Sequence, residues 1–160
     1  MRNLIAEPLR AESFASYGEV LESPAETGRN YFNDSLLNGR AKAVPSLSVV
    51  RVTPAPALPI VATKLERHAF SSQSFVPIDA GRWLIVVAPK NNRGGPDADH
   101  ARAFVAQPDQ GITFRADVWH HPLCVLDRPA RFAIFMWLEA GSGTDEEFTT
   151  LAQPFTVSIA

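Results

Sequence analysis

Short runs of β-branched and aromatic residues, separated by turns that contain proline or glycine, follow one another along most of this chain. The clearest are residues 47–52, the wholly apolar run 83–88 and residues 131–138. Branched side chains pack well on a pleated surface, and the thirteen prolines and nine glycines supply the turns. Many short strands at close spacing predict a mainly β fold, either a sandwich or a barrel. Further strands are expected at residues 19–22, 63–68, 74–78, 102–106, 112–114, 118–121 and 123–126.

The rest of the chain adds little regular structure to this pattern. Residues 11–15 have helical character and precede Gly18, which predicts a short N-terminal helix. Residues 23–45 are polar and predict irregular structure, residues 139–145 predict a loop, and residues 155–159 form the apolar tail. A length of 160 residues suits one domain, so we expect residues 1–160 to form a single unit.

Composition excludes several classes of function. The net charge is −2, the pI is about 6.1, and no basic stretch is long enough to follow a phosphate backbone, which argues against nucleic acid as a partner. The longest apolar run, 83–89, is far too short to span a membrane, and the N-terminus does not resemble a signal peptide. Cys124 is the only cysteine, so we expect a reducing, cytoplasmic location.

Two histidine segments, about 50 residues apart, carry the strongest functional signal. His68 ends the segment 65–68, and His120 and His121 stand side by side before Pro122. Histidine changes charge near neutral pH and is the commonest metal ligand. Because strand side chains alternate between faces, Glu66 and His68 share a face that Arg67 does not, and His120 and His121 oppose each other. Both segments can meet inside one small barrel.

The spacing of these residues resembles the metal-site pattern of the cupin superfamily, whose fold is a double-stranded β-barrel, or jelly roll. In that pattern Glu66 stands at the first histidine position, His68 at the second, Gln73 at the acid position and His120 at the last histidine. Asp117 stands where the pattern has a glycine. One carboxylate, two imidazoles and an amide oxygen could hold a divalent metal such as Ni, Mn or Zn, or could work with no metal.

More specifically, the chain resembles the ureidoglycolate lyase family of allantoin and purine catabolism. The resemblance implies a cupin barrel, a homodimer and the cleavage of ureidoglycolate to glyoxylate and urea, a carbon–nitrogen lyase reaction. Small barrels of this type also expose strand edges that often pair. The matching stretches run in order and comprise residues 8–9, 14–20, 65–68, 72–77, 84–89, 102–104, 110–111 and 118–123.

The reaction needs a base for the substrate hydroxyl, an acid for the leaving nitrogen and a cation for the carboxylate. His68 and His120 suit proton transfer, Glu66 could orient an imidazole, act as base or bind metal, and Gln73 could bind the ureido group. Arginine binds carboxylate in a fork. Candidates for substrate binding are Arg51 and Arg102, with Arg82 and Arg115 as further possibilities, and Trp119 and His121, although a core or structural role is at least as typical of these last two.

Several positions depart from the family pattern, namely Thr113, Phe114, Asp117, Met136 and Trp137. They motivate two alternatives. One is a divergent metal-dependent cupin enzyme that acts on another small carboxylate. The other is a non-catalytic barrel that binds small acids, for which ligands would raise thermal stability without turnover.

Overall fold

The computed structural model describes residues 1–141 and 143–160. Ser142, in the loop predicted for residues 139–145, lies outside the described residues. The elements in chain order are β1 (Asn3–Pro8), α1 (Ala11–Phe14), β2 (Gly18–Leu21), β3 (Val44–Val52), β4 (Ile60–His68), β5 (Gln73–Asp79), β6 (Trp83–Ala88), the 3-10 helix η1 (Ala98–His100), β7 (Arg102–Ala106), β8 (Gly111–Phe114), β9 (Trp119–His120), β10 (Cys124–Val125), β11 (Ala130–Leu138) and β12 (Glu146–Ile159).

Six strands close into a ring. Strands β6, β7, β1, β12, β4 and β9 are neighbours in that order, and β9 also pairs with β6, so the sheet has no free edge along this path. All six strands contribute apolar side chains to one buried cluster, which includes Leu65, Val86, Trp119 and Phe155. Burial of this cluster against itself stabilises the ring, because apolar area removed from water is the main favourable contribution to folding.

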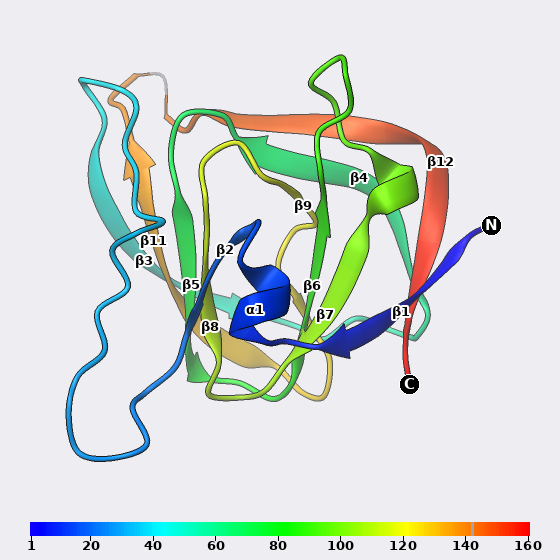
Figure 1. The fold of residues 1–160 in the computed structure, drawn as a ribbon, viewed down its shortest axis with the longest axis horizontal. Helices are drawn as coiled ribbons and strands as arrows, with labels where there is room; N and C mark the ends of the chain where they lie inside the picture. Colours follow the sequence, from blue (N-terminus) through cyan, green and yellow to red (C-terminus); the bar gives the residue numbers. More distant parts are fainter. Residues whose placement is uncertain (142) are drawn as a thin grey trace.

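A second sheet covers one side of the ring. Its strands lie in the order β2, β8, β5, β11 and β3, and Figure 1 shows them beside the ring, with α1 in front. A second apolar cluster fills the space between the two layers and includes Phe14, Val87, Ile112, Phe114 and Phe132. Along β6, successive side chains therefore serve different cores, Val86 in the ring and Val87 between the layers, as strand alternation requires. All six β6 residues are buried, as expected for its apolar sequence.

This architecture confirms the predicted mainly β, cupin-like barrel with a short N-terminal helix. Two strands were not expected from the sequence. Strand β1 pairs in parallel with β7 and β12, far from it in the chain. The first part of β12 is polar, and its register with β4 shifts between Thr150 and Phe155, around a proline that cannot donate to a ladder. Among the described residues, no helix is long and apolar enough to cross a membrane.

Candidate active site

The ring and the second sheet bring the four predicted reactive residues to one buried region between them. Glu66 and His120 are direct partners across β4 and β9, and His120 is also the partner of Val87, which faces the second sheet. His68 follows two residues after Glu66 on the same side of β4, and its ring lies 6.2 Å from that of His120. Gln73 begins β5 as the partner of Phe114, whose ring stacks on His120 at 4.1 Å. All four side chains are buried.

Hydrogen bonds orient both imidazoles with Nε2 toward the site. The Nδ1 atom of His120 donates to the carbonyl of Val118 at 2.8 Å, so its Nε2 atom is the one directed at the site, 3.4 Å from Oε1 of Glu66. The Nδ1 atom of His68 lies 3.2 Å from Oδ1 of Asp145. Two different partners thus leave Nε2 of both histidines available to a substrate, as an acid, a base or a ligand requires.

Several buried polar atoms in this region have no hydrogen-bond partner. Within residues 1–141 and 143–160 these include Nε2 of His68, Nε2 of His120 and Oε1 of Gln73. A buried donor or acceptor without a partner costs about 1–3 kcal/mol, so native proteins rarely keep several of them together without a function. The cluster therefore has the character of a binding site for a small polar molecule.

The surroundings of the site shift the pKa values of its titratable groups in different directions. Burial, reinforced by His120, lowers the pKa of His68 and favours the neutral imidazole at neutral pH. Burial opposes ionisation of Glu66, but His120, Glu146 and His68 together outweigh it and lower the pKa of this carboxyl. Glu146, the partner of His68 across β12 and β4, has a raised pKa because of burial and the adjacent Glu66. A neutral imidazole thus lies near two carboxyl groups whose pKa values are shifted in opposite directions.

Asp145 and Glu146 were not found by sequence reasoning. Asp145 falls in the loop predicted for residues 139–145, and Glu146 lies in the polar part of β12 that was not expected to form a strand. Their proximity to His68 depends on the pairing of β12 with β4. No local sequence signal indicates that register.

The turn between β8 and β9, which positions His120, contains an informative departure from the cupin pattern. Asp117 stands at the glycine position and has a φ of 70°, in the left-handed region that glycine adopts without cost. Aspartate is among the residues that tolerate this region best. Its carboxylate accepts a hydrogen bond from Nη1 of Arg67 at 2.7 Å and pairs with Lys90, while its amide donates to the His68 carbonyl at 2.8 Å. Asp117 therefore adopts the left-handed backbone conformation that the cupin pattern provides with a glycine.

The two residues that flank His120 differ in their surroundings. Trp119 faces the ring core, where its Nε1 atom donates to the Gly94 carbonyl at 3.0 Å, so its indole points away from the cluster. His121 is half-buried, its Nδ1 atom lies 2.9 Å from the Pro122 carbonyl, and burial lowers its pKa. Contact of either residue with substrate stays a prediction.

The structure does not bring Arg51 and Arg102 into the cluster. Arg51 is exposed on β3 and aligns with Arg131 and Asp79, at the opposite end of β5 from Gln73. Arg102 binds Glu7 at 2.6 Å and the Ser13 carbonyl at 2.9 Å, two strands away from His120. Of the two further candidates, Arg82 binds Asp127, whereas Arg115 directly follows Phe114, with its Nε atom 3.4 Å from Oγ of Ser35.

The side chains as placed do not form a metal cage. In the part of the chain that the structure describes, no three histidine, cysteine, aspartate or glutamate side chains surround a common point. Oε1 of Glu66 lies 3.4 Å from Nε2 of His120, and the two imidazole rings are 6.2 Å apart. A divalent metal at Glu66, His68, Gln73 and His120 stays a prediction.

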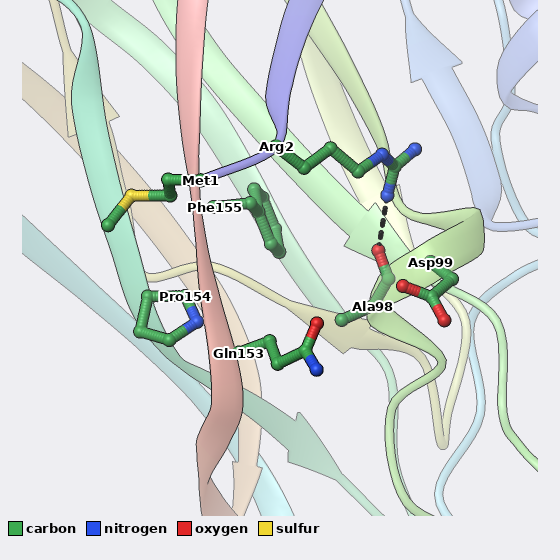
Figure 2. Close-up of a pocket in the computed structure, with 7 residues that line it drawn as sticks. All are labelled: Met1, Arg2, Ala98, Asp99, Gln153, Pro154 and Phe155. Atoms are coloured by element: carbon green, nitrogen blue, oxygen red, sulfur yellow. Dashed lines mark hydrogen bonds between the residues drawn. The ribbon is translucent and has the colours of Figure 1, made fainter.

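A surface pocket elsewhere illustrates the contrast with this cluster. A hollow of about 340 Å³ is lined by residues from the N-terminus, η1 and β12. Figure 2 shows these lining residues. Its arginine, Arg2, already donates to the Ala98 carbonyl at 2.5 Å. The pocket contains no histidine. We therefore assign the chemistry to the buried cluster between the layers, which is built from paired acids and bases.

The fold and this cluster together define a cupin-type barrel with a buried acid–base site. The model of the ureidoglycolate lyase family matches residues 1–158, and the chain belongs to this family. A protein of Agrobacterium fabrum is 37% identical over 100% of this chain and 98% of its own length. Proteins named ureidoglycolate lyase from Stutzerimonas stutzeri and Pseudomonas syringae are 34% and 33% identical, over 94% and 96% of this chain and 92% and 94% of their own lengths.

Proposed function

We propose that this protein is a ureidoglycolate lyase that releases glyoxylate and urea, with the buried cluster between the layers as its active site. The observation that carries the proposal is the pair of unpartnered Nε2 atoms of His68 and His120 beside the carboxylate of Glu66. Membership of the ureidoglycolate lyase family and full-length relatives of that name support the choice of substrate.

The substrate carries a hydroxyl and a ureido nitrogen on the same carbon, next to a carboxylate. In the proposed reaction, a base takes the hydroxyl proton, the C–O bond becomes a carbonyl, the C–N bond breaks, and the nitrogen leaves as urea after it receives a proton. The neutral His68 is the base, because its lowered pKa keeps Nε2 unprotonated at neutral pH. His120, held beside the Glu66 carboxylate, delivers the proton to the leaving nitrogen.

Two residues complete the assignment. Gln73 offers its unpartnered Oε1 atom and its amide N–H groups to the ureido group, which presents matching donors and a matching acceptor. Glu146, whose pKa is raised by burial and by the adjacent Glu66, is a further acid at the edge of the site. The cation that binds the substrate carboxylate stays a prediction among Arg51, Arg102, Arg82 and Arg115, of which Arg115 directly follows Phe114, the residue that stacks on His120.

The test is a product balance with the purified full-length protein. Ureidoglycolate is incubated with wild-type protein and with a variant that carries both His68→Ala and His120→Ala, and glyoxylate, urea and ammonia are quantified. We expect equal amounts of glyoxylate and urea without ammonia from the wild type, at a rate far above that of the variant. Equal rates for both proteins would refute the proposal, and release of ammonia would indicate hydrolysis of the ureido group instead.

The metal prediction is tested in the same assay. One arm contains a chelator and the others contain added Ni, Mn or Zn. If the side chains act alone, the chelator leaves the rate unchanged. Loss of activity with chelator and its recovery with one of the ions would assign the four residues as ligands instead.

We further propose a homodimer and a cytoplasmic location. Strand β3 is an edge of the second sheet and exposes Val44, Leu47 and Val49, an apolar surface of the kind that a second copy can cover. The single cysteine, Cys124, is buried and free, as is usual in a reducing compartment. Light scattering on the purified protein gives the oligomeric state, and cell fractionation gives the location.

A further inference from the structure

Asp145 is a buried acid beside the site that several groups contact, and it is not among the four residues of the cupin metal-site pattern. It is the last residue before β12, and its side chain is 3% exposed. One oxygen, Oδ2, accepts a hydrogen bond from the Phe70 amide at 2.6 Å. The Ser71 hydroxyl donates to the same carboxylate at 3.0 Å, and Nδ1 of His68 lies 3.2 Å from Oδ1. Nη2 of Arg40 lies 3.7 Å from Oδ1.

We infer that Asp145 is a positioning residue that fixes the tautomer of His68, so that Nδ1 carries the proton and Nε2 faces the reacting groups. This inference rests on the proposed function for its effect on turnover, but not for its effect on the imidazole. A carboxylate accepts hydrogen bonds and cannot donate them. The neutral ring beside it must therefore donate from Nδ1, which leaves the lone pair on the buried, unpartnered Nε2 atom.

The surroundings of Asp145 keep it ionised for this task. Burial opposes its ionisation, but hydrogen bonds from the Phe70 amide, Ser71 and His68 outweigh burial and lower the pKa of the carboxyl. The same hydrogen bonds, all from residues 68–71 at the end of β4 and the turn after it, hold the carboxylate in place. An acid held in this way orients the adjacent imidazole with little freedom.

The geometry also predicts what an asparagine would do at this position. The Phe70 amide needs an acceptor where Oδ2 stands, so the carbonyl oxygen of the amide side chain would take that place. Its NH₂ group would then face Nδ1 of His68 and donate to it. The imidazole would have to move its proton to Nε2, where it could no longer act as a base. Wrong-tautomer substitutions of this kind are known to cost large factors in turnover.

A residue that merely anchors the loop would behave differently. Asp145 also accepts hydrogen bonds from Phe70 and Ser71 that connect the segment before β12 to the turn after β4. Loss of these hydrogen bonds alone would lower the free energy of unfolding. It would not exchange one imidazole tautomer for the other. The tautomer of His68 is therefore the measurement that separates positioning from anchoring.

The experiment combines imidazole ¹⁵N NMR with steady-state kinetics on the full-length protein, for wild type, Asp145→Asn and the control Asp127→Asn. Asp127 is a matched aspartate that accepts hydrogen bonds from the amide and guanidinium of Arg82, at the end of β6 opposite His120. We expect wild type and Asp127→Asn to have the Nδ1–H tautomer at His68, and Asp145→Asn to have Nε2–H. We also expect kcat on ureidoglycolate to fall at least about tenfold in Asp145→Asn, with a KM change below about threefold.

The outcomes separate this inference from the proposed function. An unchanged His68 tautomer in folded Asp145→Asn overturns the inference, even if turnover falls. If the wild type does not cleave ureidoglycolate, the NMR result still decides the role of Asp145. Should Asp145→Asn fail to fold, the wild-type spectrum alone decides, because a predominant Nε2–H tautomer at His68 contradicts the inference.

Discussion

The two sides of the β4–β9 strand pair differ in how their polar groups are used. On the ring side, Arg67 donates to Asp117 and Glu147 at 2.7 Å each and to the Gly94 carbonyl at 3.2 Å. Its guanidinium also lies 4.6 Å from the centre of the Trp119 ring. The polar atoms on this side are paired, as expected of groups whose role is to hold the fold together.

On the side that faces the second sheet, the neighbouring residues in the chain remain partly unpaired. The Nε2 atoms of His68 and His120 are buried and lack hydrogen bonds. They lie next to Glu66 and Glu146, whose pKa values are shifted in opposite directions. Residues adjacent in sequence thus serve different purposes, because alternation along a strand sends them to different cores. We expect substitutions on the ring side to lower stability and those on the other side to lower turnover.

The largest expected effect is on turnover in His120→Gln. Removal of the imidazole that delivers the proton should lower kcat by about 10²–10⁴-fold, the usual contribution of a general acid or base. Glutamine retains much of the volume packed against Phe114, so we expect a folded protein. Steady-state kinetics and circular dichroism check both parts. A folded variant with more than about a third of wild-type kcat would contradict the role of His120.

Arg67→Met should show the opposite behaviour. The substitution removes charged hydrogen bonds to two carboxylates that are partly exposed, and we expect the free energy of unfolding to fall by about 2 kcal/mol. The value of kcat should stay within about threefold of wild type, because Arg67 faces away from the cluster. Urea unfolding followed by kinetics on the same preparation measures both quantities. An Arg67→Met variant with unchanged stability and low kcat would contradict the proposal that the ring side contributes to stability and the opposite side to turnover.

Substitutions at Asp117 test the turn that joins the two sides. Asp117→Ala places a less tolerant residue at a φ of 70° and removes the partner of Arg67, so we expect a loss of about 1–2 kcal/mol in stability. Asp117→Gly removes the same hydrogen bond to Arg67, but glycine adopts a φ of 70° without strain. We therefore expect it to lower the free energy of unfolding less than the alanine substitution does. Equal destabilisation of the two variants would show that backbone conformation contributes nothing here.

The smallest expected effect is a pH dependence of stability that comes from the site. In the folded protein the pKa of His68 lies below its ordinary value of 6.5, so between these two values the unfolded chain binds more protons than the folded one. The free energy of unfolding therefore falls as the pH is lowered through 6.5 toward the folded-state pKa. We expect Tm to fall between pH 7.5 and 5.5 in wild type, and to fall less in His68→Gln. Identical slopes would contradict the lowered pKa.

Local sequence rules predicted much of this arrangement. Alternation placed Glu66 and His68 on one side of a strand and Arg67 on the other, and the structure has them so. The short N-terminal helix and the buried strand 83–88 were also predicted from nearby residues. The predicted helix end at Gly18 was wrong, because the helix ends at Phe14 and Gly18 begins β2, where a side chain would clash with the Thr113 carbonyl.

Features that depend on long-range pairing could not be predicted. Asp145 and Glu146 reach His68 only through the antiparallel pairing of β12 with β4, which joins residues 78 positions apart. Strand β1 is held by parallel partners near the middle and the end of the chain. Register between such strands is decided by which faces are buried in the assembled barrel, and a single strand does not contain that information.

The most direct test of the difference between the two sides uses adjacent residues. Values of kcat and of the free energy of unfolding are measured for His68→Gln, Arg67→Met and the variant that carries both. The account predicts that His68→Gln lowers kcat at least about a hundredfold, that Arg67→Met lowers stability with kcat nearly unchanged, and that the double variant shows both losses undiminished. A loss of kcat in Arg67→Met as large as that in His68→Gln would contradict it.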